Sequence, residues 1–174
     1  MLNRYEIDGE VVRIFLQKRN GSEVITLIDL ADLSRADQLP RAWYADVHKT
    51  TGRLRVKGPS LLSTSIRSNV FMHRFITEAP SGLEVDHRNH DELDNRRVNL
   101  RIVTRSGNGQ NRVGAVVHSK SGVRNVHWDA KRRKWSVFIK VNNRSRFIGR
   151  FESLQEATAA AVQARIDHMP YSTK

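Results

Sequence analysis

The chain has 174 residues, enough for one domain or two small ones, and it contains no cysteine. Its formal net charge is +12 and its sequence pI is about 10.8, a balance that favours a polyanionic partner. The composition excludes disulfides and cysteine-bound zinc, and no apolar run approaches the ~20 residues of a membrane-spanning helix.

Residues 1–70 predict a β-rich segment. The expected elements are, in chain order, strands at 11–16 and 24–28, a helical or looped piece at 29–39, and strands at 43–47 and 54–56. Asn20-Gly21 is typical of a hairpin turn, Pro40 ends the third piece, and residues 49–52 supply a second turn. The opening residues lack the apolar segment of a signal peptide. We therefore expect a cytoplasmic protein.

The most informative stretch begins after an apolar strand through Leu83 and Val85. A turn-rich loop follows, and a second strand runs through Leu100 and Ile102. The polar residues of this stretch are, in order, Asp86, His87, Asn95, Asn99 and Asn108. Metal-dependent phosphodiester hydrolysis needs an oxygen ligand for a hard cation, a neutral imidazole beside it, and amides that orient both.

Each of these residues also has a commoner structural interpretation when it is taken alone. Asp86 could be a surface acid at a strand end, and His87 a buried histidine with ordinary partners. Asn95 follows an aspartate and is typical of a turn residue that bonds to nearby backbone. Asn99 could be a strand-entry residue. Only their occurrence together, in this order, favours a nuclease site.

The ordered set resembles the HNH nucleases, in the branch of phage homing endonucleases, over roughly residues 72 to 112. Met72-His73-Arg74-Phe75-Ile76 resembles the lead-in of that family. The resemblance implies a strand–strand–helix (ββα-metal) unit at residues 71–112 that holds one divalent ion, Mg²⁺ or Mn²⁺. It also implies a bacterial or phage-infected host cell. It further implies the following roles: His87 takes a proton from water, Asn99 orients the loop or the imidazole, Asp86 and Asn108 are metal ligands, and His73, Arg74 and Asn95 give support.

Residues 113–121 have the small, polar-ended character of a linker, and residues 122–174 predict three short strands and one helix. The helix is expected from Ser153 to Met169, with a capping-box pattern of Ser153 and Glu156 and with Pro170 just beyond its end. This part of the chain is the more basic. Residues 113–174 carry 12 Lys/Arg against 4 Asp/Glu (net +8), whereas residues 1–112 carry 18 against 14 (net +4).

Gly122-Val123-Arg124, Lys134-Trp135, Gly149-x-Phe151 and the alanine-rich helix resemble the APETALA/ethylene-response-factor DNA-binding domain. That resemblance implies that a three-stranded antiparallel sheet, and not the helix, contacts DNA. Strand alternation should then turn Trp135, Val137 and Ile139 toward the helix. The implied DNA contacts are Arg124, Trp128, Ser136, Phe138, Lys140, Phe147 and Arg150. Phe138 replaces a residue that is commonly charged, and a basic sheet can also be a solvated face that binds nothing.

Together these patterns predict an α+β protein that nicks double-stranded DNA as a monomeric, metal-dependent, homing-type endonuclease without disulfide or structural zinc. The main alternative is a sequence-specific DNA-binding regulator whose nuclease-like unit is inert. An RNA-binding protein is less favoured, because no motif for stacking single-stranded bases is evident. Homing of a mobile element and processing of phage DNA both remain compatible with the sequence.

Overall fold

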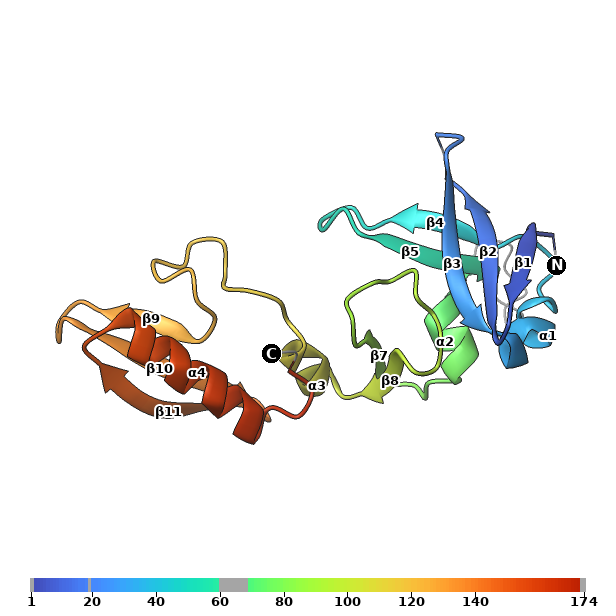
Figure 1. Ribbon diagram of the computed structural model, residues 1–174. Helices are drawn as coiled ribbons and strands as arrows, with labels where there is room; N and C mark the ends of the chain where they lie inside the picture. Colours follow the sequence, from blue (N-terminus) through green and yellow to red (C-terminus); the bar gives the residue numbers. More distant parts are fainter. Residues whose placement is uncertain (1, 19, 60–68, 173–174) are drawn as a thin grey trace. The chain divides into compact units, whose positions relative to one another are not determined.

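The computed structural model describes residues 2–18, 20–59 and 69–172, and the chain divides into two compact units, Met1–Ile102 and Val103–Lys174 (Figure 1). Each unit is described by itself. Several small antiparallel sheets and a few helices make up the chain, which is compatible with the α+β class. The predicted domain boundaries stay predictions. No helix in the described part of the chain is long and apolar enough to span a membrane.

The first unit begins with an antiparallel sheet of three strands in the order β1-β2-β3. The strands are β1 (Tyr5–Asp8), β2 (Val11–Gln17) and β3 (Glu23–Asp29). The predicted hairpin between β2 and β3 is confirmed by their antiparallel register, whereas β1 was not predicted. Val12, Ile14 and Leu16 alternate along β2 with more exposed residues and are fully buried, so this face of the sheet forms part of the core.

A second three-stranded sheet, in the order β4-β5-β6, packs into the same core. Its strands are β4 (Tyr44–Val47), β5 (Leu54–Pro59) and β6 (Asn69–Phe71); the short helices η1 (Leu30–Asp32) and α1 (Leu33–Ala36) precede it. Trp43 is buried and donates its Nε1 proton to the carbonyl of Ala36 (3.0 Å). Gly58 faces this indole, and a Cβ there would lie 2.8 Å from the ring, so only glycine fits without rearrangement.

The segment that carries the predicted nuclease residues starts with helix α2 (Met72–Thr77), which the sequence analysis did not predict. Strands β7 (Glu84–His87) and β8 (Leu100–Val103) follow as a two-stranded sheet. Helix α3 (Arg105–Gln110) comes next in the chain and opens the second unit. The order of these last three elements is strand, strand, helix.

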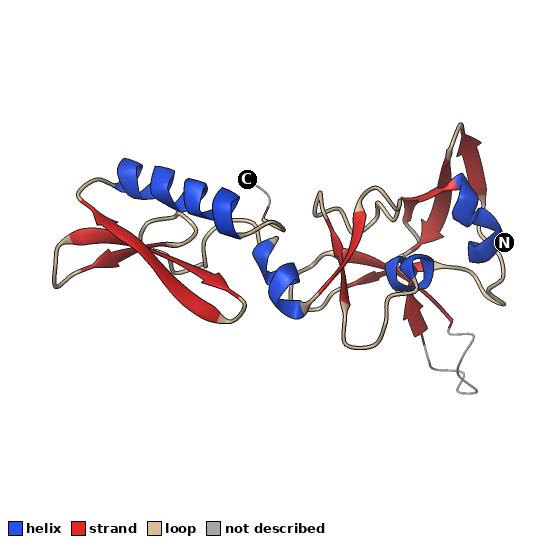
Figure 2. Ribbon diagram, turned by 90° about the horizontal axis from the view of Figure 1, so that it is seen from below, coloured by secondary structure: helices blue, strands red, loops and turns tan. Residues whose placement is uncertain are grey.

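The rest of the second unit is an antiparallel sheet in the order β11-β10-β9 with one long helix along one face (Figure 2). Its elements are β9 (Val126–Asp129), β10 (Lys134–Val141), β11 (Arg144–Phe151) and α4 (Leu154–His168). The predicted strands and helix are confirmed, and so is the capping box of Ser153 and Glu156. Val137 of β10 packs with alanines of α4 in the core of this unit.

Candidate functional site

Asp86 and His87 stand at the end of β7 and are both buried, with 8% and 6% of their surface exposed. The carboxylate of Asp86 is paired across the two-stranded sheet with Arg101 of β8. Arg101 donates to Asp86 Oδ2 from Nε at 2.7 Å and from Nη2 at 2.6 Å. A buried carboxylate needs such a partner, because an unpaired charge in this environment is costly.

His87 is oriented by a relay that begins in the N-terminal sheet. Its Nε2 lies 3.3 Å from Asn95 Oδ1, and Asn95 donates from Nδ2 to the hydroxyl of Thr26 on β3 (2.9 Å). Because Asn95 Oδ1 can only accept, the imidazole that bonds to it carries its proton on Nε2 and its lone pair on Nδ1. Asn95 is fully buried and also donates to the carbonyl of Glu92, so it combines a turn role with support of the histidine.

Asn99 shapes the loop between the two strands. Its Oδ1 accepts from the backbone N–H of Asn89 (3.0 Å), and its Nδ2 donates to the carbonyl of Asp94 (2.8 Å). Its own carbonyl accepts from the N–H of Arg88. Of the two roles expected for Asn99, these contacts favour orientation of the loop.

His73 and Arg74 lie on α2. The ring of His73 stacks on Phe71 and meets the ring of His87 edge-on, with centroids 5.2 Å apart and an interplanar angle of 87°. Arg74 donates to the carbonyls of Ala79, Pro80 and Leu83, at 2.7 to 3.2 Å, and so fixes the turn that leads into β7. The two residues therefore support the imidazole and its strand in different ways.

Burial keeps both histidines of this cluster neutral near pH 7. It lowers the pKa of His87 below its usual value, although the hydrogen bond to Asn95 and nearby carboxylates act in the opposite direction. Burial lowers the pKa of His73 to about 3, helped by repulsion from the protonated form of His87 and from the charges of Arg74 and Arg55. A neutral imidazole can accept a proton, which is what a general base must do.

The described residues offer a divalent ion single hard donors and no preformed cluster, and a metal at this site stays a prediction. Among the described residues no group of three or more His, Cys, Asp or Glu could hold a metal by itself. Asp86 offers a carboxylate oxygen, and Asn108 on α3 offers an amide oxygen, which are hard donors of the kind that Mg²⁺ and Mn²⁺ prefer. Asp86 belongs to the first unit and Asn108 to the second, so their pairing stays a prediction.

Residues 71–110 match the family model of the HNH endonucleases. The match runs from the end of β6 to the end of α3 and supports an HNH-type nuclease that acts on DNA. No curated protein and no solved structure matches the chain. The resemblance of the C-terminal unit to the APETALA/ethylene-response-factor domain stays a prediction.

The structure gathers five of the seven predicted DNA contacts on the sheet face opposite α4, here called the outer face. These are Ser136, Phe138, Lys140, Phe147 and Arg150. Those on β10 alternate with Val137 and Ile139, which pack toward α4 as expected. Those on β11 are cross-strand partners of β10 residues: Arg150 pairs with Ser136, and Phe147 pairs with Phe138. Lys140, Phe147 and Arg150 are exposed, whereas the Ser136 hydroxyl is buried without a hydrogen-bond partner in the described part of the chain.

Two predicted DNA contacts lie elsewhere. Trp128 is the direct partner of Trp135 across β9 and β10, and their rings meet at 4.9 Å, so Trp128 is on the α4 side of the sheet. The guanidinium of Arg124 donates to backbone carbonyls at the end of α3. A DNA contact for either residue stays a prediction that their positions do not favour.

The sequence analysis missed two residues that contact the HNH site residues and one residue of the outer face. Thr26 and Arg101 contact Asn95 and Asp86, and His127 lies on the outer face as the direct partner of Ser136. Arg101 sits in a strand beside the site, so its charge was a usable signal. Nothing in the sequence around Thr26 connects it with a residue 69 positions later.

Proposed function

We propose that this chain is a metal-dependent, homing-type endonuclease that hydrolyses one strand of duplex DNA. The observation that carries the proposal is the buried His87, held through Asn95 by Thr26, directly beside the buried carboxylate of Asp86. A histidine with a fixed tautomer and a lowered pKa next to an oxygen ligand is an arrangement suited to activating water.

In this mechanism Nδ1 of His87 accepts a proton from the attacking water while Asn95 holds the proton on Nε2. Asn99 keeps the loop closed, so that the imidazole and Asp86 retain their relative positions during the step. Asp86 and Asn108 would hold a divalent ion, Mg²⁺ or Mn²⁺. When bound, that ion neutralises charge that develops on the phosphate and on the departing 3′ oxygen.

The outer face supplies the grip on DNA in this proposal. Lys140 and Arg150 are exposed there beside Phe147, and residues 113–174 carry a net charge of +8. Each cation that neutralises a phosphate releases condensed counterions, which gives affinity without base recognition. The chain holds one copy of the nuclease motif, so a monomer is expected to nick one strand and not to break both.

A specific contact favours a second candidate, a DNA-binding regulator with an inert nuclease-like unit. Arg101 occupies Oδ2 of the carboxylate that a metal would need, with 12% of the Arg101 side chain exposed. An ion pair of this kind would persist in a protein that never binds metal. The hydrogen bonds that link His87, Asn95 and Thr26 argue for the nuclease, because a regulator does not need an oriented base.

Nicking of a supercoiled plasmid in the presence of Mg²⁺ separates the two candidates. We expect the wild-type protein to relax the plasmid, His87→Ala to leave it supercoiled, and His118→Ala to behave as wild type. His118 is the matched control, because it is an exposed histidine between α3 and β9, outside the HNH segment. A wild-type protein that binds the plasmid but does not cut it over a range of Mg²⁺ and Mn²⁺ concentrations would favour the regulator.

A further inference from the structure

Helix α3 is too short and too rich in glycine to be stable by itself. It spans six residues, and Gly107 and Gly109 flank Asn108 in it. Isolated helices below about 12 residues are marginal in water, and glycine is a poor helix former. Thr104 caps the start of the helix, because its hydroxyl accepts from the N–H of Gly107 at 3.1 Å. The end of the helix must be held by another part of the chain.

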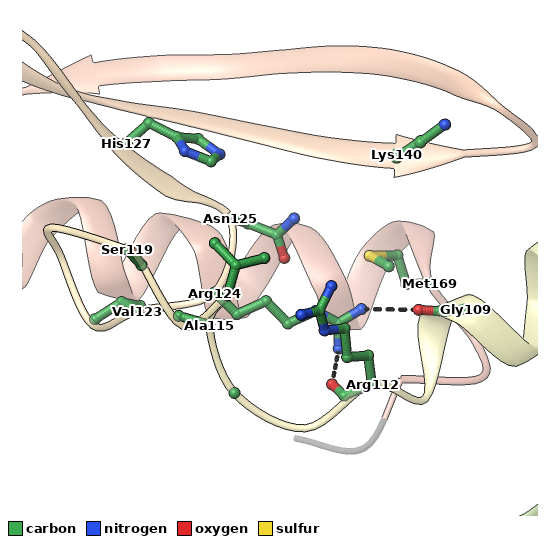
Figure 3. Close-up of a pocket in the computed structure, with 12 residues that line it drawn as sticks. Gly109, Arg112, Ala115, Ser119, Val123, Arg124, Asn125, His127, Lys140 and Met169 are labelled. Carbon is green, nitrogen blue, oxygen red and sulfur yellow. Dashed lines mark hydrogen bonds between the residues drawn. The ribbon is translucent and has the colours of Figure 1, made fainter. Parts of the chain in front are cut away.

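Arg124 holds that end. Its Nη2 donates to the carbonyl of Gln110 (3.1 Å). Its Nη2 also donates to the carbonyl of Gly109 (3.4 Å), and its Nη1 donates to that of Arg112; Figure 3 shows these two bonds. The last carbonyls of a helix lack donors within the helix, and a cation near them also interacts favourably with the helix dipole. One guanidinium therefore donates hydrogen bonds to three backbone carbonyls that would otherwise be hydrogen-bonded by water.

The segment after α4 contacts the same helix. The N–H of Tyr171 donates to Oε1 of Gln110 (3.3 Å), and the Tyr171 ring lies so close to Gly107 that an added Cβ would come within 3.1 Å of it. Arg165 of α4 donates to the carbonyl of Arg124 (3.3 Å), which fixes the backbone of Arg124. Helix α3 is thus anchored by residues before and after the sheet-and-helix body of the second unit.

We propose that Arg124 is a positioning residue for Asn108, and that through it the C-terminal unit determines where a nuclease side chain stands. The inference rests on the proposed function, in which Asn108 is a metal ligand. The N–H of Asn108 donates to the carbonyl of Thr104 (2.9 Å), and its carbonyl accepts from the N–H of Asn111 (3.0 Å). The direction of the Asn108 side chain therefore follows the helix, and the helix follows Arg124.

The clamp lies beside side chains of the outer face. Arg124 lines a cavity of about 230 Å³ together with Arg112, and His127 and Lys140 line it from β9 and β10 (Figure 3). His127 and Lys140 are exposed and belong to the surface proposed for DNA. The residue that holds α3 and residues of the surface proposed for DNA are therefore neighbours within one unit.

The test uses the full chain with Arg124→Ala, Arg124→Lys and the control Arg112→Ala. Arg112 is exposed and lines the same cavity, but only its backbone carbonyl belongs to the clamp. Three quantities are measured: hydrogen exchange of the α3 amides without metal, DNA affinity in EDTA, and the Mg²⁺ concentration for half-maximal nicking. Arg124→Ala should speed the exchange and raise the Mg²⁺ requirement, each about tenfold, with DNA affinity changed less than about threefold.

Arg124→Lys should recover part of both effects, since an ammonium can still donate to a carbonyl, and Arg112→Ala should leave exchange and Mg²⁺ requirement unchanged. The inference is overturned if Arg124→Ala weakens DNA binding as strongly as Lys140→Ala while exchange in α3 stays at the wild-type rate. If circular dichroism shows that Arg124→Ala is unfolded, Arg124→Lys carries the test, with smaller shifts in the same direction. Failure of the wild type to nick would sink the proposed function alone, since the exchange measurement tests the clamp without catalysis.

Discussion

The two units use polar side chains in opposite ways. In the first unit Asp94, Asn95 and Asn99 are nearly inaccessible, at 0% to 5% exposed. Asn99 donates to the carbonyl of Asp94 within the loop, and Asn95 donates to Thr26 of the N-terminal sheet. On the outer face of the second unit, Lys140 and Arg150 are exposed. A buried and bonded network fixes one geometry, whereas exposed cations adapt to a phosphate backbone. The comparison teaches that catalysis and DNA binding are separable, so substitutions in the buried network should change rates and those on the outer face should change affinities.

The largest expected effect comes from replacing the proposed general base, His87, with a side chain of similar size that cannot accept the proton. His87→Gln should lower the nicking rate by about 10²–10⁴-fold, because general-base catalysis typically contributes that much. DNA affinity should stay within a few-fold of wild type, since His87 is buried and is not one of the cations that bind phosphate in the proposal. Single-turnover nicking and a filter-binding titration measure the two quantities. A variant that cuts at the wild-type rate would remove His87 from the mechanism.

The next prediction changes the partner of the histidine. Asn95→Asp places a carboxylate against Nε2 of His87 and should raise the pKa of the imidazole. A general base works only when it is unprotonated, so the acidic limb of the pH–rate profile should move to higher pH, with roughly a tenfold loss of rate on that limb. Thr26→Val is the companion variant, because it removes the partner of Asn95 without adding charge. Profiles of Asn95→Asp and wild type that superimpose would contradict the relay.

The candidate site residues were predicted from the order of residues along a short stretch of sequence, and much of the fold was predicted from similar short-range patterns. Ser153 and Glu156 define the start of α4 through contacts three residues apart, and alternation along β10 places Val137 on the core side. Such signals lie within one element and depend on little else. Helix α2 escaped prediction because it has six residues and no side-chain cap at its start.

The sequence could not predict which residues contact each other when they lie far apart along the chain. Thr26 supports a loop 69 residues away, which depends on β3 running beside that loop. Trp128 carries the signature of a DNA contact, yet the register that pairs it with Trp135 puts it on the helix side. The sequence presents Arg124 as an implied DNA contact, whereas its contacts with the end of α3 depend on which backbone carbonyls lie within reach. Alternation gives the face within one strand, whereas the register between strands is a tertiary property.

A third prediction concerns stability in acid and tests how firmly the buried network is held. The folded-state pKa of His73 is about 3 and that of His87 is lowered, whereas both have their usual value near 6.5 when unfolded. The unfolded chain therefore binds more protons below pH 6.5, and the unfolding free energy of the first unit should fall there by up to about 1.4 kcal/mol per pH unit per histidine. The lowered pKa of Asp94, due to its hydrogen bond with Arg96, adds a loss only at still lower pH.

Urea titrations at pH 7.5, 6 and 5 measure this dependence, with His73→Phe as the informative variant. Phenylalanine can stack on Phe71 as the imidazole does, but it does not titrate. The variant should show a shallower loss of stability between pH 6.5 and 5. An equal loss in both proteins would mean that His73 is not buried in its neutral form.

The smallest expected effect separates the two faces of the C-terminal sheet. Lys140→Ala and Arg150→Ala each remove one exposed cation from the outer face, so the slope of log affinity against log salt concentration should become shallower by about 0.9 per substitution. Trp128→Ala removes a large side chain that packs against Trp135 on the other face, so it should lower thermal stability and leave the salt slope unchanged. Affinity titrations between about 50 and 200 mM salt compare all three variants. A change in slope that corresponds to the loss of one phosphate contact can be detected over this range. If Trp128→Ala weakens binding while its melting temperature is that of wild type, DNA approaches the sheet from the helix side, and the outer face loses its assigned role.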